Sequence, residues 1–170
     1  GPGHRRARGE HAAPQRGGRL LVGVAGGAGG AHAVIGHSCG GAALGAALAL
    51  GLRPQRLVIA SAPTRVSEMP ITIAKDAGLP ARAMPRYLRL LERHAGRALM
   101  EFDLVVAGPR CGIPGLLVHD RDDAVIPYAD AEALTTAWPQ LEVMTTEGLG
   151  HRDILADAGV IRRITDFVTG

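Results

Sequence analysis

The feature that most constrains this chain is a glycine-rich turn between an apolar run and a helical segment. Residues 31–52 read AHAVIGHSCGGAALGAALALGL, in which two β-branched residues precede the glycines and a stretch rich in alanine and leucine follows them. This order predicts a strand, a sharp turn and a helix, with Ser38 at the apex of the turn. Gly36 and Gly40 flank Ser38 in a G-x-S-x-G pattern, which suits a turn where strand and helix backbones pass close together.

The segments after this turn alternate between strand and helix. Apolar runs predict strands at 56–60, 115–119 and 141–145, and the first of them has the continuous apolar character of a strand buried on both faces. Helices are predicted at 40–50, 85–95 and 128–138, followed by a last amphipathic helix with its apolar face between 160 and 168. This alternation indicates an α/β fold, with helices flanking a mostly parallel sheet.

Polar clusters follow two of these strands. The strand at 115–119 runs into Asp120-Arg-Asp-Asp123, and the strand at 141–145 runs into a glycine-rich loop that carries His151. A serine hydroxyl is a poor nucleophile until a base takes its proton, and a histidine can be that base. A carboxylate on the far ring nitrogen would fix the tautomer of the histidine. These residue types therefore predict acyl-transfer chemistry at one edge of the sheet.

The order Ser38, then an acid after a strand, then His151 after the next strand resembles that of the α/β-hydrolase family. The resemblance is carried by G-x-S-x-G, by the Gly-Leu-Gly-His loop and by residues 119–127, HDRDDAVIP, which are similar to the family's G-x-x-D-D-x-x-x-P turn. It implies a serine hydrolase that cleaves a carboxylic ester or thioester through an acyl-enzyme on Ser38. His151 would be its general base and acid. For His37, beside the turn, a packing or hydrogen-bonding role is expected rather than that of a base.

The resemblance also implies the supporting parts of the site. The matched turn makes Asp122 the carboxylate that orients His151, with Asp123 bracing the turn and Asp120 as a further candidate. The backbone N–H of Cys39, at the start of the helix, would hold the oxyanion. No cofactor is implied. No metal site is expected either, because the sequence has no H-E-x-x-H motif and no Cys/His set with zinc spacing.

Residues 62–112 interrupt the alternation of strands and helices. The helix predicted at 85–95 has leucines on one side and arginines on the other. An insertion between the strands whose ends carry the chemistry suits a short helical lid that bounds substrate size. A packed connector with solvated arginines is the alternative interpretation. We therefore expect one domain over residues 19–170, with the lid insertion at about 62–112.

The start of the chain departs from the family pattern. Residues 1–18, rich in glycine, proline and arginine, predict a disordered basic tail. The family places several strands and an oxyanion loop ahead of the nucleophile turn, and residues 19–30 match neither. We expect a sheet that is incomplete at the N-terminus, with the strand before Ser38 as an open apolar edge prone to self-association. A non-catalytic or degenerate hydrolase-fold fragment that acts as a binding or association module is the alternative function.

Charge and cysteine usage limit the partners and the compartment. The net charge of +3 arises in the first 19 residues, which hold five arginines and a single acidic residue, so no nucleic-acid partner is expected. Cys39 and Cys111 form no C-x-x-C pair, which favours a cytoplasmic location. No apolar run is long enough for a membrane span. The LLVGVA run resembles a signal peptide, but glycines interrupt it and cleavage at residues 31–33 would remove part of the strand before Ser38. The expected ligand is a small-molecule acyl substrate.

Overall fold

The computed structural model describes residues 30–170 and contains one four-stranded sheet. The strands are β1 (Ala33–His37), β2 (Arg56–Ala60), β3 (Gly115–Asp120) and β4 (Glu142–Thr146). All three neighbouring pairs are parallel, and the spatial order β1-β2-β3-β4 is the order of the sequence. Because neighbouring strands are parallel, the segment between each strand and the next brings the chain back to the same end of the sheet. This confirms the predicted α/β arrangement. The predicted tail, residues 1–18, lies outside the described residues.

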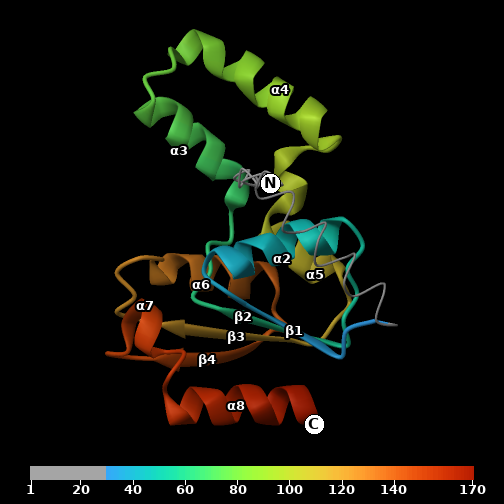
Figure 1. Ribbon diagram of the computed structural model, residues 1–170, viewed down its shortest axis with the longest axis vertical. Helices are drawn as coiled ribbons and strands as arrows, with labels where there is room; N and C mark the ends of the chain where they lie inside the picture. The colour runs from blue at the N-terminus through green and yellow to red at the C-terminus, as the bar shows by residue number, and fades with distance from the viewer. Residues whose placement is uncertain (1–29) are drawn as a thin grey trace, which may run out of the picture.

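Helices cover both faces of this sheet. In order, they are α2 (Cys39–Ala49), α3 (Met69–Asp76), α4 (Met84–Ala95), α5 (Leu104–Arg110), α6 (Tyr128–Ala137), α7 (Gly150–Asp153) and α8 (Ala158–Thr169). Figure 1 shows α2, α5 and α6 on one face and α8 on the other, with α3 and α4 standing away from the sheet beyond α2. Short 3₁₀ turns at Val66–Glu68, Ala81–Ala83 and Leu99–Phe102 join these segments.

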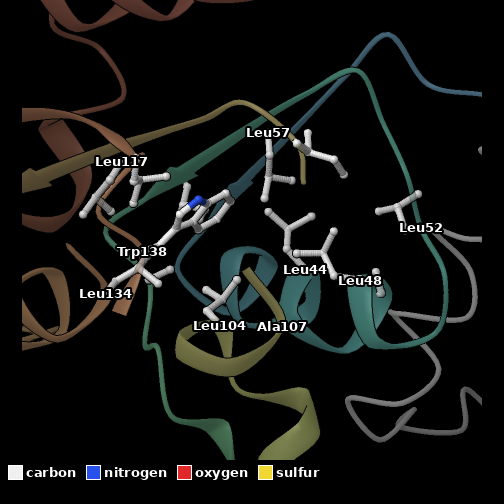
Figure 2. Close-up of a cluster of buried hydrophobic side chains, with 14 of the residues drawn as sticks. Leu44, Leu48, Leu52, Leu57, Leu104, Ala107, Leu117, Leu134 and Trp138 are labelled. Atoms are coloured by element: carbon white, nitrogen blue, oxygen red, sulfur yellow. The ribbon is translucent and has the colours of Figure 1, made fainter. Parts of the chain in front are cut away.

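The central strands have no polar face because both of their faces are covered. In β2, Leu57 and Ile59 belong to the cluster under α2, α5 and α6, whereas Val58 and Ala60 belong to the cluster under α8. All four side chains are fully buried. This is the period-2 alternation of a strand that packs helices on both sides, and it explains the unbroken apolar run in the sequence. Figure 2 shows Trp138 wedged between Leu117, Leu134 and Leu57 in the larger cluster.

Helix boundaries follow local signals. Gly51, with φ of 100°, comes just after α2, and Gly96, with φ of 69°, is the left-handed cap that ends α4. A residue with a Cβ would be strained at either position, since L side chains disfavour positive φ. The helix ends predicted at residues 50 and 95 therefore agree with the observed ends to within one residue.

The segment predicted as a lid divides into two parts. Helices α3 and α4 form a lobe that projects from the body of the molecule (Figure 1), and no residue of α4 is buried. Helix α5, by contrast, belongs to the main core, where Leu104 is fully buried and Ala107 packs with it. The apolar residues of α5 make it a layer of the fold, so the lobe ends near residue 103.

A buried carboxylate closes the base of this lobe. Asp103 Oδ1 accepts a hydrogen bond from the backbone N–H of Ser67 at 2.8 Å, and its Oδ2 accepts one from the Ser67 hydroxyl at 2.7 Å. A second anchor lies just before the lobe, where the N–H and hydroxyl of Thr64 both donate to Asp130 Oδ1 at 2.7 Å. The lobe is thus tied at its base to α5 and to α6.

Strand β1 is an edge strand among the described residues. Its Ile35 faces away from α2 and is 54% exposed, in contrast to the buried residues of β2 and β3. Within residues 30–170, no helix combines the length and the apolar character needed to cross a membrane.

Candidate active site

Ser38 occupies a strained turn between β1 and α2. Its φ of 53° and ψ of −124° lie where a residue with a side chain is rarely found, and its N–H donates to Ala60 O at 3.1 Å. Strain of this kind persists only where the surroundings enforce it. Here β1 pairs with β2 on one side while α2 begins on the other, so the Ser38 side chain is held at the C-terminal edge of the sheet.

Two glycines are required for this turn, and they differ in part from those expected. A Cβ on Gly36 would lie 2.6 Å from Leu44 Cδ1 and 2.8 Å from Gly40 O, so this position needs a glycine. A Cβ on Gly41 would overlap Ala62 Cβ, whereas one on Gly40 would have no described atom within 4 Å. The expectation that position 40 must be a glycine is therefore wrong. That requirement falls one residue later, because position 41 faces Ala62 and the backbone of Gly36 on the first turn of α2.

His151 links Ser38 to a carboxylate. It is the second residue of α7, and its Nε2 lies 3.0 Å from Ser38 Oγ. Its Nδ1 lies 2.8 Å from Asp123 Oδ2. A carboxylate only accepts hydrogen bonds, so Nδ1 carries the proton and Nε2 is free to accept from the serine hydroxyl. The structure thus joins three side chains that are far apart in the sequence into one chain of hydrogen bonds.

The structure corrects the choice among the three aspartates. Asp122 does not contact His151: it is exposed, and its Oδ2 accepts from the Gly148 N–H at 2.9 Å. The reason lies in the turn after β3, where the Asp122 N–H donates to Asp120 Oδ1 at 2.9 Å. This tight Asx turn sends the Asp122 side chain toward the next loop and returns Asp123 to the interior. The spacing of the sequence motif does not reveal this turn, so it does not predict which aspartate faces His151.

Asp120 has a bracing position and is not part of the chain of hydrogen bonds. It is fully buried at the end of β3, and its Oδ2 accepts from the Thr146 hydroxyl and from the Leu149 N–H at 3.1 Å. Burial raises the pKa of this carboxyl, but the hydrogen bonds from Thr146 and from backbone N–H groups outweigh burial and lower it. An ionised Asp120 therefore holds the loop that leads to His151.

The environment of Asp123 also favours the charged carboxylate. Its side chain has no exposed surface, and burial alone would raise its pKa. The N–H groups of Ile126 and Val125, each 2.8 Å from Oδ1, and the bond from His151 outweigh burial, so the pKa lies below its ordinary value. Asp123 is therefore an ionised acceptor whose Oδ1 is occupied by the backbone and whose Oδ2 faces His151.

Two residues beside Asp123 were not singled out from the sequence. His119, on β3, is buried with its Nε2 donating to Ile126 O at 3.0 Å and 3.8 Å from Asp123 Oδ2. Ser61 follows β2 with φ of 42°, and its buried hydroxyl lies near enough to Asp123 to favour ionisation, although it makes no hydrogen bond of normal geometry. Their positions in the sequence could have indicated them. Ser61 directly follows β2, the neighbour of β1, and His119 lies near the end of β3, the strand that leads into the aspartates.

The remaining expected residues lie on the rim of the same site. Because Cys39 is the first residue of α2, its backbone N–H is one of the helix N–H groups without an intrahelical acceptor. The residue is exposed. His37, half-buried on β1, contacts His151 rather than Ser38. Within residues 30–170, no group of three or more histidine, cysteine or carboxylate side chains is arranged to hold a metal ion.

Comparison of this chain with known proteins identifies its fold. No protein-family model and no curated protein sequence matches the chain. Solved structures do: the monoacylglycerol lipase of Paleococcus ferrophilus superposes with a TM-score of 0.66 at 16% identity, over 93% of this chain and 76% of the lipase. The esterase RhEst1 of a Rhodococcus species gives 0.61 at 15% identity, over 98% and 77%. BpoC of Mycobacterium tuberculosis, provisionally assigned as a non-heme bromoperoxidase, gives 0.64 at 15% identity, over 95% and 77%. The chain therefore has the α/β-hydrolase fold.

Proposed function

We propose that this protein is a serine hydrolase that cleaves a carboxylic ester or thioester. The observation that carries the proposal is the continuous chain of hydrogen bonds from Ser38 Oγ through both nitrogens of His151 to Asp123 Oδ2. The structural neighbours include an esterase and a lipase, which supports an ester as the substrate class. In this proposal Asp123, and not Asp122, orients the histidine.

The reaction follows from the donor and acceptor order of this chain. His151 Nε2 takes the hydroxyl proton as Ser38 Oγ bonds to the acyl carbon, and the imidazolium is stabilised by Asp123. Collapse of the tetrahedral intermediate breaks the bond to the leaving oxygen or sulfur, which receives the proton from His151. Water then adds to the acyl-enzyme with the same histidine as base, releasing the acid and restoring Ser38.

The negative oxygen of the intermediate needs donors that are in place before the reaction. The N–H of Cys39 is suited to this role because it is at the N-terminus of α2, directly after Ser38, where the helix dipole also favours negative charge. Loss of one such donor typically lowers kcat by about 10²–10³-fold. This donor is a backbone group, so the Cys39 side chain is dispensable in the proposal.

The α3–α4 lobe is the proposed boundary of the acyl site. Its chain leaves the sheet at Ser61, directly after β2 and at the same edge as Ser38. The contacts of Ser67 with the buried Asp103 and of Thr64 with Asp130 hold its base, while α4 itself is only partly covered. A lobe with a fixed base and lightly packed helices suits a lid that limits substrate size.

Turnover of p-nitrophenyl acetate tests the proposal directly. We expect Ser38→Ala and His151→Ala each to reduce hydrolysis to near the buffer rate. Cys39→Ala keeps the backbone N–H and should retain turnover within a few-fold, and it also removes the only thiol beside Ser38 as a competing nucleophile. Undiminished turnover in Ser38→Ala, with the variant correctly folded by circular dichroism, would refute the proposal.

Association through β1, which is an edge strand among residues 30–170, is a second candidate, favoured by the half-exposed Ile35 on that strand. It predicts concentration-dependent oligomers in light scattering that Ile35→Lys abolishes, together with no turnover in the wild type. A monomer that hydrolyses the ester would exclude this candidate.

We also propose a cytoplasmic location for the protein. The free thiols of Cys39 and Cys111 support this location.

A further inference from the structure

A contact outside the Ser38–His151–Asp123 chain joins the same two segments. His37 Nε2 lies 2.8 Å from the backbone carbonyl oxygen of His151, and the two imidazole rings are tilted at 39° with centroids 4.7 Å apart. A carbonyl oxygen only accepts, so His37 Nε2 carries the proton and donates. The residue immediately before Ser38 is thus bonded to the main chain of His151.

This contact matters because the loop before His151 is conformationally permissive. Gly148 and Gly150 have φ of 79° and 63°, values that glycine adopts without strain, so the loop gains little rigidity from its own sequence. Its position must come from contacts with other elements. The Ser38 Oγ to His151 Nε2 separation of 3.0 Å depends on that position.

Two of these contacts come from the β3 side of the site. Asp122 Oδ2 accepts from the Gly148 N–H at 2.9 Å, and Asp120 Oδ2 accepts from the Leu149 N–H at 3.1 Å. Neither of them connects the loop to β1, the strand that leads into Ser38. The His37 bond does so, because His37 is the last residue of β1 and its partner is the main-chain carbonyl of His151.

We infer that His37 is a positioning residue that sets the distance between Ser38 and His151. It would act through the donated hydrogen bond and would touch neither the substrate nor the transferred proton. The inference rests on the proposed function for its kinetic consequence. Misplacement of reacting groups by about 1 Å can cost about 10²-fold in rate, so a single bond that fixes this distance is significant.

A matched pair of substitutions separates the bond from the bulk of the side chain. His37→Gln places an amide N–H close to where Nε2 lies, and His37→Met has a similar length and no donor. We expect His37→Met to lower kcat for p-nitrophenyl acetate by about 10- to 100-fold with KM nearly unchanged. His37→Gln should remain within about threefold of the wild type, since the donor is retained.

A second readout does not need turnover. The Nδ1–H proton of His151, hydrogen-bonded to Asp123, should give a resolved downfield NMR signal in the wild type and in His37→Gln. In His37→Met that signal should broaden or vanish as the ring leaves its fixed position. If the wild type fails to hydrolyse esters, the proposed function fails, and the NMR comparison still decides the role of His37.

Two results would overturn the inference. His37→Met could retain both its kcat and the downfield signal, which would show that the bond fixes nothing. Alternatively, His37→Gln could lose as much as His37→Met, which would show that the imidazole ring, and not the donor, is what the site requires. Thermal unfolding of all three proteins establishes that they are folded under the assay conditions.

Discussion

The replacement of Asp123 by asparagine should disable the site through the tautomer of His151. Asp123 Oδ1 accepts from the N–H groups of Val125 and Ile126, both at 2.8 Å, so the asparagine carbonyl should take that place. Its NH₂ group then faces His151 Nδ1, which must accept and can no longer donate. The ring proton moves to Nε2, where it removes the acceptor for the Ser38 hydroxyl.

The size of the effect can be estimated from this change of tautomer. In serine triads, the equivalent substitution leaves the geometry intact and lowers kcat by about 10⁴-fold. At about 1.36 kcal/mol for each factor of ten, the lost transition-state stabilisation is about 5.4 kcal/mol. Because the substitution nearly preserves volume and the Oδ1 contacts, KM should change far less than kcat.

Asp122→Asn is the matched control, one residue away in the same turn. The exposed Asp122 carboxylate accepts a single backbone hydrogen bond from Gly148, which an amide oxygen can also accept. We expect kcat within about threefold of the wild type, in keeping with the modest net value of one exposed hydrogen bond. Steady-state hydrolysis of p-nitrophenyl acetate by the three proteins is the assay. A large loss in Asp122→Asn with an active Asp123→Asn would refute the assignment of the acid.

Three further predictions concern stability and the lobe. Gly41→Ala should lower the free energy of unfolding in urea by about 1–3 kcal/mol, because its Cβ overlaps Ala62, whereas Gly40→Ala should be near neutral; equal effects would contradict the account of the turn. Asp103→Ala removes both bonds to Ser67 and should speed hydrogen exchange in α3 and α4 while that in β2 and β3 stays slow; an unchanged exchange pattern would show that the lobe is not tied at Asp103. The folded pKa of Asp123 lies below its ordinary value of 3.8, so its charge stabilises the fold above that pH and the contribution is lost as pH falls through the folded pKa. Urea unfolding measured from neutral to acid pH should therefore show a smaller acid-side loss in Asp123→Asn than in the wild type, and parallel curves would contradict this.

The elements that could be predicted from the sequence are those with strong local signals. The strand expected at 56–60 has the same bounds in the structure, because a continuous apolar run between polar residues leaves few alternatives. The turn at Ser38 and the ends of the helices predicted at 40–50 and 85–95 were also predictable, since each depends on the conformational preferences of one or two residues. The order of Ser38, the aspartates and His151 along the chain then indicated the resemblance to a known family, which implied their roles.

The features that could not be predicted depend on tertiary geometry. Asp122 and Asp123 are adjacent and chemically identical, and only the Asx turn at Asp120 decides which of them faces inward. Residues 104–110, which form α5, were included in the lid because residues 62–112 interrupt the alternation of strands and helices, yet the burial of α5 against α2 makes it part of the core. His37 was recognised as a residue beside the turn, but its partner, the carbonyl of His151, is 114 residues away.

The central claim, that Ser38 is the nucleophile, is tested most directly by peptide mapping after reaction with a fluorophosphonate. The phosphonyl group should be found in mass spectra on the peptide containing Ser38, at one equivalent per chain, and Ser38→Ala should take up none. Labelling should also be strongly reduced in His151→Ala, because the hydroxyl then has no base at 3.0 Å. A phosphonyl group located on another residue, or full labelling of Ser38→Ala, would contradict the account.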